Sequence, residues 1–143
     1  MTREQVQAFF ERYREAFSRL DGDAVADLWH TGSGITDGGN PDGSARLTWW
    51  ADDAPMRDNM RRLCAAYRDA GFVRCDFTLR AFVPMGPAHA FAHLDWTLTR
   101  ADGSVLQAFA TGYQLVRTAD GLRVLLAVAH SENLAAMKAA SGG

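Results

Sequence analysis

The amino-acid sequence predicts an α+β domain in which a curved antiparallel sheet wraps around helices, and two observations support this. Apolar residues recur at helical spacing in the first half of the 143-residue chain. From Val73 to Ser131 apolar and polar residues alternate in four segments separated by Gly- or Pro-marked turns, which is typical of strands. Because such a sheet leaves space between its inner face and the helices, we expect a single domain, residues 1–143, with a pocket.

Two helices are expected before residue 31. Residues 4–20 carry an apolar stripe at helical spacing, and Asp21-Gly22-Asp23 interrupts it because Gly adopts positive φ readily. Asp23 is suited to cap a second, shorter helix that runs to Trp29 or His30.

A loop-rich stretch and a third helix come next. Residues 31–45 are rich in Gly, Ser, Asn and Asp, so they predict a loop with room for one short strand at Ser33–Asp37. Asp52 or Asp53 caps the third helix, which has Pro55 in its first turn and ends at Gly71.

Four strands complete the expected sheet. They are residues 73–83, 88–100, 104–118 and 122–131, separated by Pro84-Met85-Gly86-Pro87, Asp102-Gly103 and Asp120-Gly121. Residues 133–140 predict a short helical tail, and the last three residues are expected to fray.

Strand parity decides which side chains enter the pocket. In residues 90–98 one row consists of Ala90, Ala92, Leu94, Trp96 and Leu98, and the other of Phe91, His93, Asp95 and Thr97. If Phe91 and Phe109 both face the helices, His93 and Asp95 lie inside, within reach of Tyr113 or His130. The outward row then exposes Leu94, Trp96 and Leu98, which predicts a homodimer through the outer sheet face. A one-residue bulge would reverse this parity and place Trp96 inside.

Composition excludes several classes of function. The net charge is -2, and no Lys/Arg run with interleaved aromatics occurs, so nucleic acid is not an expected partner. The chain begins without an apolar leader and has no apolar run of about eighteen residues, so we expect a cytoplasmic protein with no membrane partner. Cys64 and Cys75 occupy apolar positions of a helix and a strand and are expected to be buried thiols.

Three stretches resemble the NTF2-like superfamily, the group containing the ketosteroid isomerases and the SnoaL-like polyketide cyclases. They are Glu11-Arg12-Tyr13, Asp23-Ala24-Val25-Ala26-Asp27-Leu28-Trp29 and Ala129-His130-Ser131-Glu132-Asn133-Leu134. The resemblance covers nearly the whole chain and implies the family's cone, with three N-terminal helices on a curved antiparallel sheet. It also implies a cofactor-independent enzyme of the isomerase, cyclase or dehydratase kind, using acid–base proton transfer on a small hydrophobic or carbonyl-containing ligand.

The family's catalytic residues carry over unevenly. Counted on from the second helix, Asp37 falls where the isomerases place their general base, and Tyr13 falls at their oxyanion-donating Tyr. Their second oxyanion donor, a protonated Asp, has no match, and Tyr113 occupies its place. The cyclase branch implies an acid–base Asp beside a His, which His93 with Asp95 would imitate.

Residue chemistry leaves alternatives open at each of these positions. Asp37 can abstract a proton beside a carbonyl group, or it can simply cap the Asp37-Gly38-Gly39-Asn40 turn. His93 and Asp95 can form an acid–base couple or a buried pair that satisfies itself. Tyr13 and Tyr113 can donate to an oxyanion or serve as core aromatics.

A metal site is a further alternative for the histidines. His89 and His93 lie roughly 13 Å apart if both are on one strand, which is too far to share an ion. His93, Asp95 and His130 remain as a combination that strand geometry allows, but we expect no metal.

The expected ligand-binding residues are mostly aromatic: Phe17, Trp29, Trp49, Trp50, Phe77, Phe109 and His130. Trp49 and Trp50 are adjacent, so one is expected to line the pocket mouth while the other packs at an interface. His130 is either a base at the pocket mouth or a surface residue. Two alternatives to an enzyme are a non-catalytic protein that binds a small ligand in the same pocket and a dimerisation module.

Overall fold

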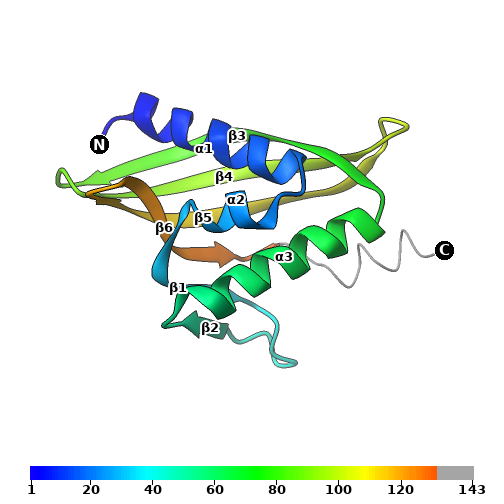
Figure 1. The fold of residues 1–143 in the computed structure, drawn as a ribbon, viewed down its shortest axis with the longest axis horizontal. Coiled ribbons are helices and arrows are strands. Elements are labelled where there is room, and N and C mark those ends of the chain that lie inside the picture. The colour runs from blue at the N-terminus through cyan, green and yellow to red at the C-terminus, as the bar shows by residue number, and fades with distance from the viewer. Residues whose placement is uncertain (132–143) are drawn as a thin grey trace.

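A six-stranded sheet carries the helices on one face in the computed structural model, which describes residues 1–131 (Figure 1). The helices are α1 (Arg3–Ser18), α2 (Gly22–Ala26) and α3 (Asp53–Asp69). The strands are β1 (Trp29–Asp37), β2 (Arg46–Trp50), β3 (Phe72–Met85), β4 (His89–Arg100), β5 (Val105–Thr118) and β6 (Gly121–Ala129). The sheet order is β2-β1-β6-β5-β4-β3. The predicted α+β architecture is confirmed, whereas the predicted tail at 133–140 lies outside the described residues.

The two long helices form where their apolar stripes predict them. A capping box starts α1, because the Thr2 side chain accepts from the Gln5 N–H while the Gln5 side chain accepts from the Thr2 N–H. Asp52 is the N-cap residue of α3, and Gly71 follows its C-cap at a φ of +90°. None of the helices within residues 1–131 is both long and apolar enough to cross a lipid bilayer.

The short helix α2 is capped by Asp21 and not by Asp23 as predicted. The Asp21 carboxylate accepts from the Ala24 N–H at 3.0 Å. Asp23 instead forms an ion pair with Arg61 of α3, with 2.7 Å between Oδ1 and Nη2. The helix also ends sooner than predicted, because Trp29 already belongs to β1.

The predicted loop is present at residues 38–45, and it connects β1 and β2 as a hairpin. The strand expected at Ser33–Asp37 is present, but it starts at Trp29, and β2 was not anticipated. Asp37 lies directly opposite Arg46 in this hairpin. On its other side β1 pairs in parallel with β6, which attaches the hairpin to the main sheet.

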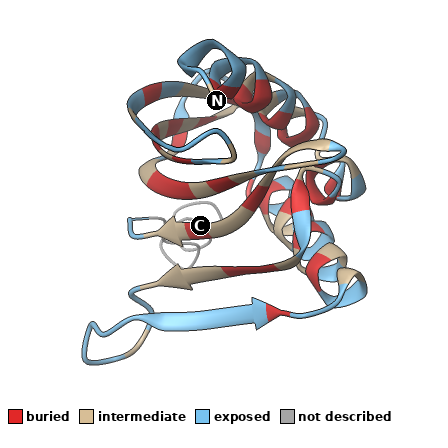
Figure 2. Ribbon diagram, turned by 90° about the vertical axis from the view of Figure 1, so that its left-hand side faces the viewer, coloured by how far each residue is buried: buried red, intermediate tan, exposed pale blue. Residues whose placement is uncertain are grey.

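The predicted parity of β4 is wrong. Leu94, Trp96 and Leu98 are buried toward the helices, at 0%, 4% and 2% exposure. His93 and Asp95, half-buried, therefore belong to the outer row. Figure 2 shows buried and intermediate residues along the main strands of the sheet.

The register of β4 and β5 explains this correction without a bulge at the centre of β4. Trp96 pairs with Phe109, whereas Phe91 pairs with Gln114. Directly paired residues point to the same face, so Phe91 and Phe109 lie on opposite faces of the sheet. Burying the row with Leu94 and Trp96 removes more apolar surface from water than burying the row with His93.

The outer sheet face carries aromatic side chains over glycines. A Cβ atom at Gly112 would lie 2.6 Å from Phe91 Cζ, and one at Gly34 would lie 2.9 Å from Trp49 Cε3. Both distances are shorter than van der Waals contact, so the aromatic rings use the space that a side chain would fill. The residues on which the homodimer prediction was based, Leu94, Trp96 and Leu98, do not lie on this face, so they cannot form the interface.

Candidate functional site

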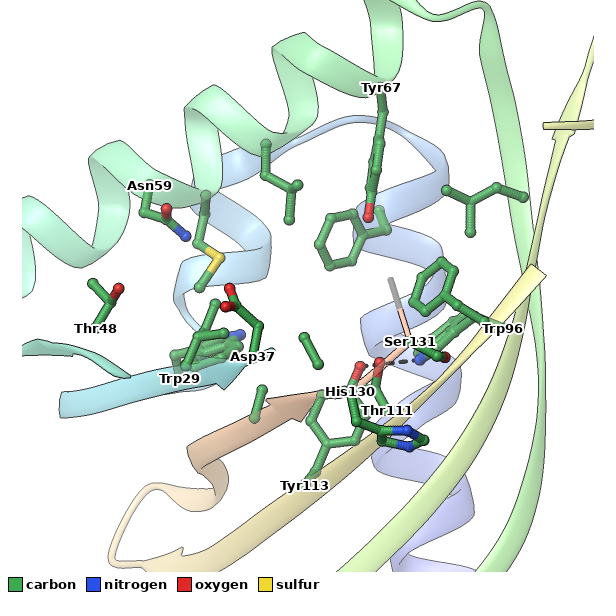
Figure 3. A pocket seen from close by; sticks show the side chains of 18 of the residues that line it. Trp29, Asp37, Thr48, Asn59, Tyr67, Trp96, Thr111, Tyr113, His130 and Ser131 are labelled. Carbon is green, nitrogen blue, oxygen red and sulfur yellow. Dashed lines mark hydrogen bonds between the residues drawn. The ribbon is translucent and has the colours of Figure 1, made fainter. Parts of the chain in front are cut away.

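A cavity of about 700 Å³ lies between the inner sheet face and the helices (Figure 3). Its walls come from α1, α3 and all six strands. Of the expected site residues it contains Tyr13, Phe17, Trp29, Asp37, Trp50, Phe109, Tyr113 and His130. The predicted pocket thus has a counterpart in the structure, and its lining is predominantly aromatic and apolar.

Two indole–phenol pairs form part of the cavity wall. Trp29 Nε1 donates to the Tyr13 hydroxyl at 3.3 Å, and Trp96 Nε1 donates to the Tyr113 hydroxyl at 3.0 Å. An indole N–H can only donate, so each phenol oxygen is the acceptor and its own hydrogen points away from the indole. The Tyr13 and Tyr113 ring centroids are 5.9 Å apart. These contacts fix the positions of two buried hydroxyl groups, one from α1 and one from β5.

Asp37 supplies a carboxylate to the cavity from the end of β1. Figure 3 shows this side chain projecting into the space between α3 and the sheet. Its Oδ1 accepts from the Gly39 N–H at 2.9 Å, and its Oδ2 accepts from Arg46 Nη2 at 3.0 Å. The Asp37 side chain is 26% exposed and that of Arg46 is 59% exposed, so the ion pair lies at the cavity mouth. Asp37 therefore both closes the turn and lines the cavity.

Gly39 allows the chain to fold closely over this ion pair. A Cβ atom at Gly39 would lie 2.7 Å from Asp37 Oδ1 and 2.8 Å from Arg46 Cζ. Any side chain at Gly39 would displace the Asp37–Arg46 pair. The Gly38-Gly39 sequence, which predicted a turn, thus also shapes the cavity mouth.

Four expected site residues do not line the cavity: His93, Asp95, Trp49 and Phe77. His93 and Asp95 lie on the outer face for the reason of register given above. Asp95 Oδ2 pairs with Arg80 Nε at 3.1 Å, so the structure does not show the predicted His93–Asp95 couple. His93 instead reaches His130, with 3.1 Å between the two Nε2 atoms.

Trp49 and Phe77 are absent from the cavity lining for different reasons. Trp49 and Trp50 alternate on β2, so Trp50 points inward and is 9% exposed, while Trp49 points outward and is 53% exposed. Trp50 therefore lines the cavity as expected of one of the two tryptophans, and the packing of Trp49 at an interface stays a prediction. Phe77 does face inward, but it packs against Phe10 and Trp96, at centroid distances of 6.2 and 5.3 Å.

Sequence reasoning missed several polar residues of the cavity: Arg46, Thr48, Asn59, Tyr67 and Thr111. Arg46 and Thr48 belong to β2, which was not predicted, so no signal marked them. Thr111 lies two residues before Tyr113 on β5, and strand alternation alone would have found it.

Cys75 also lines the cavity, and the prediction of two buried free thiols is confirmed. Burial raises the pKa of the Cys75 thiol to about 11, because an apolar surrounding disfavours the thiolate. Burial raises the pKa of Cys64 to about 11 in the same way. Residues 1–131 contain no group of three or more His, Cys, Asp or Glu residues placed to hold a metal ion.

The family described as NTF2-like protein (DUF6841) matches residues 3–132 of the chain. No curated protein sequence matches this chain. Among solved structures, an NTF-2 like protein of unknown function from Shewanella oneidensis MR-1 superimposes with a TM-score of 0.69 at 13% identity. That alignment covers 92% of this chain and 100% of the other.

Two further structures carry names that refer to chemistry. A putative dehydratase of the NTF2-like family from Streptomyces avermitilis has a TM-score of 0.62 at 16% identity, covering 91% of this chain and 95% of that one. A ketosteroid isomerase-like protein from Erwinia carotovora atroseptica SCRI1043 has a TM-score of 0.59 at 18% identity, covering 93% and 99%. At these identities the similarities show the fold alone.

We predict that neither cysteine reacts with Ellman's reagent in the folded protein at pH 8. Both thiols are buried, and a pKa of about 11 leaves few thiolates at that pH. Absorbance at 412 nm should rise slowly in buffer and rapidly, to two equivalents, in guanidinium chloride. Rapid reaction of the native protein would show that the cavity wall around Cys75 is open to the reagent.

Proposed function

We propose that this chain, which belongs to the NTF2-like family (DUF6841), binds a small, largely apolar carbonyl compound in its cavity and transfers a proton on it. One observation carries the proposal. The Asp37 carboxylate lines the same cavity as the Tyr13 and Tyr113 hydroxyls, within otherwise largely aromatic and apolar walls. A base and two hydroxyl groups in one cavity are the groups that enolisation of a ketone needs.

The cavity suits a ligand of one to three fused or linked rings. Its volume of about 700 Å³ falls within the range of roughly 300–1,000 Å³ found for small-molecule sites. Aromatic side chains such as Phe17, Trp50 and Phe109 offer apolar contact to such a body. The polar side chains between them, such as Thr48, Asn59 and Thr111, would orient the ligand by hydrogen bonds.

In the proposed reaction Asp37 removes a proton from the carbon next to the ligand's carbonyl group. The electron pair of that C–H bond forms the C=C bond of the enolate while the carbonyl π pair moves to the oxygen, and a Tyr13 or Tyr113 hydroxyl donates a hydrogen bond to the resulting oxyanion. Asp37 then returns the proton to another carbon, which completes an isomerisation, or gives it to a departing hydroxyl group, which completes a dehydration. Neighbouring folds named as a putative dehydratase and as ketosteroid isomerase-like fit this reaction class.

A non-catalytic binding protein is the second candidate, and the contacts of Asp37 favour it. Gly39 and Arg46 together donate two hydrogen bonds to this carboxylate. A carboxylate that is satisfied in this way can serve to fix the cavity mouth without moving a proton. The two candidates differ in whether a bound ketone exchanges its protons.

We predict that Asp37→Asn abolishes proton exchange and leaves ligand binding nearly unchanged. The amide has the shape of the carboxylate but cannot act as a base, so the rate should fall about 10²–10⁴-fold. The probe is 2-tetralone, a bicyclic ketone with acidic protons, whose deuterium exchange in D₂O is followed by NMR. Its binding is followed by quenching of the tryptophan fluorescence.

Two variants serve as controls for this experiment. Asp42→Asn changes an exposed carboxylate in the same β1–β2 loop, and His93→Gln changes a residue outside the cavity lining. Both should exchange 2-tetralone at the wild-type rate. Binding without any wild-type exchange would replace the enzyme with the binding protein, and a loss of exchange in His93→Gln alone would assign the chemistry to His93.

We also propose that the chain forms a homodimer through its outer sheet face, now with different residues. Leu47 and Trp49 on β2 and Val83 on β3, at the two edges of the sheet, point outward and are 65%, 53% and 50% exposed. A two-fold axis would let this surface cover itself, and a stable interface buries roughly 1,200–2,000 Å² in total.

Trp49→Arg is expected to convert the dimer to monomers, because it places a charge on the apolar surface of β2. Val105→Arg is the matched control, since Val105 is also exposed but lies at the β4–β5 turn, away from β2. Light scattering measures the mass of each protein at tens of micromolar. A monomeric wild type would refute the proposed dimer without bearing on the cavity.

A further inference from the structure

We propose that His93 and His130 form a chelating site for one divalent transition-metal ion at the end of β6, where His93 of the outer sheet face meets His130, which also lines the cavity. Their Nε2 atoms face each other at 3.1 Å, with ring centroids 5.3 Å apart and ring planes inclined by 33°. This site is separate from the proposed proton transfer, since neither step of that chemistry uses His93 or His130.

The strand register brings these two histidines together across an intervening strand. His93 lies on β4 and His130 directly follows β6, with β5 between them. In the outer row His93 pairs with Gly112, and Gly112 pairs with Val128, two residues before His130. Because Ala110, the next outer-row residue of β5, carries only a methyl group, the imidazoles can meet above β5 beside the Phe91 ring that covers Gly112.

Ser131 holds the chain end that carries His130. Its hydroxyl accepts from the Ala110 N–H at 2.7 Å and donates to the Ala110 carbonyl at 3.1 Å. This pair of bonds continues the β5–β6 pairing for two residues past Ala129. The backbone of the ligand pair is therefore fixed on both strands before an ion arrives.

The distance between the two nitrogens fits two neighbouring positions around one ion. Zinc–imidazole bonds of 2.0–2.1 Å with nitrogens 3.1 Å apart give an N–Zn–N angle of about 100°, close to tetrahedral. In the absence of metal one Nε2–H group donates a hydrogen bond to the other Nε2 atom. A bound ion would replace that hydrogen between the two rings. Small rotations about χ2, which is a soft torsion for His, direct both lone pairs at the ion.

The surroundings select the kind of ion. Asp95 stands on the same row as His93 but pairs with Arg80, so within residues 1–131 the protein supplies two imidazole ligands. Imidazole nitrogens suit zinc, nickel and copper, whereas magnesium and calcium prefer oxygen. His130 is exposed, so water can fill the remaining coordination positions. The bound ion would link β4 to β6 across β5 and stabilise the folded chain by mass action.

Metal titration of the untagged full-length chain tests this site. Isothermal titration with zinc chloride, and separately with nickel chloride, should show one ion per chain for the wild type and an increase in melting temperature. His93→Gln and His130→Gln should each lose both effects. The controls His30→Gln and His89→Gln remove exposed histidines elsewhere and should keep both effects.

Additional measurements keep the result interpretable. Melting in the presence of a chelator shows that each variant folds as the wild type does, because glutamine at these half-buried or exposed positions removes no core contact. Magnesium ions should not bind.

Asp37→Asn should retain the zinc site, so the metal-site proposal does not depend on the proton-transfer proposal. A wild type that binds no zinc or nickel, or that binds no better than His93→Gln, would overturn the inference.

Discussion

The register between β4 and β5 is the constraint on which the rest of the site depends. Trp96 opposite Phe109 and Leu94 opposite Thr111 turn these four side chains toward the helices. A slip of one residue would exchange the two faces of β4 and bury His93 and Asp95 in place of Leu94 and Trp96. Burial of the apolar row opposes such a slip, because the alternative places two ionisable groups in the core.

The same register divides the chemistry of the chain between two surfaces. On the inner face Trp96 holds the Tyr113 hydroxyl inside the cavity. On the other face the small side chain of Ala110 on β5 lets His93 reach His130 at the end of β6. The β1–β2 hairpin then adds Asp37 and its partner Arg46 at the cavity mouth. The cavity and the histidine pair therefore depend on one pairing pattern, and His130 belongs to both, since it lines the cavity and contacts His93.

The sequence predicted the features that depend on local patterns. Helical spacing located α1 and α3, turn sequences located β3 to β6, and the residues of Asp37-Gly38-Gly39-Asn40 marked a turn that the structure contains. Prediction from the sequence failed where the structure depends on the pairing of strands that are far apart in the chain. β2 is a five-residue strand whose hydrogen-bond partner is β1, and the loop composition before it hid both Arg46 and Thr48. The inner row of β4 was misassigned because two phenylalanines were assumed to share a face, which only the register could settle.

The central claim is that the space between the inner sheet face and the helices is a ligand site. The four tryptophans test it directly, because Trp29, Trp50 and Trp96 line the cavity while Trp49 lies on the outer face. Their indole N–H signals can be followed in ¹⁵N-labelled protein during titration with 2-naphthol, a bicyclic phenol of suitable size. The account predicts that the signals of Trp29, Trp50 and Trp96 shift together to one saturating end point while that of Trp49 stays in place. A shift confined to Trp49, or no saturable shift of the other three, would contradict it.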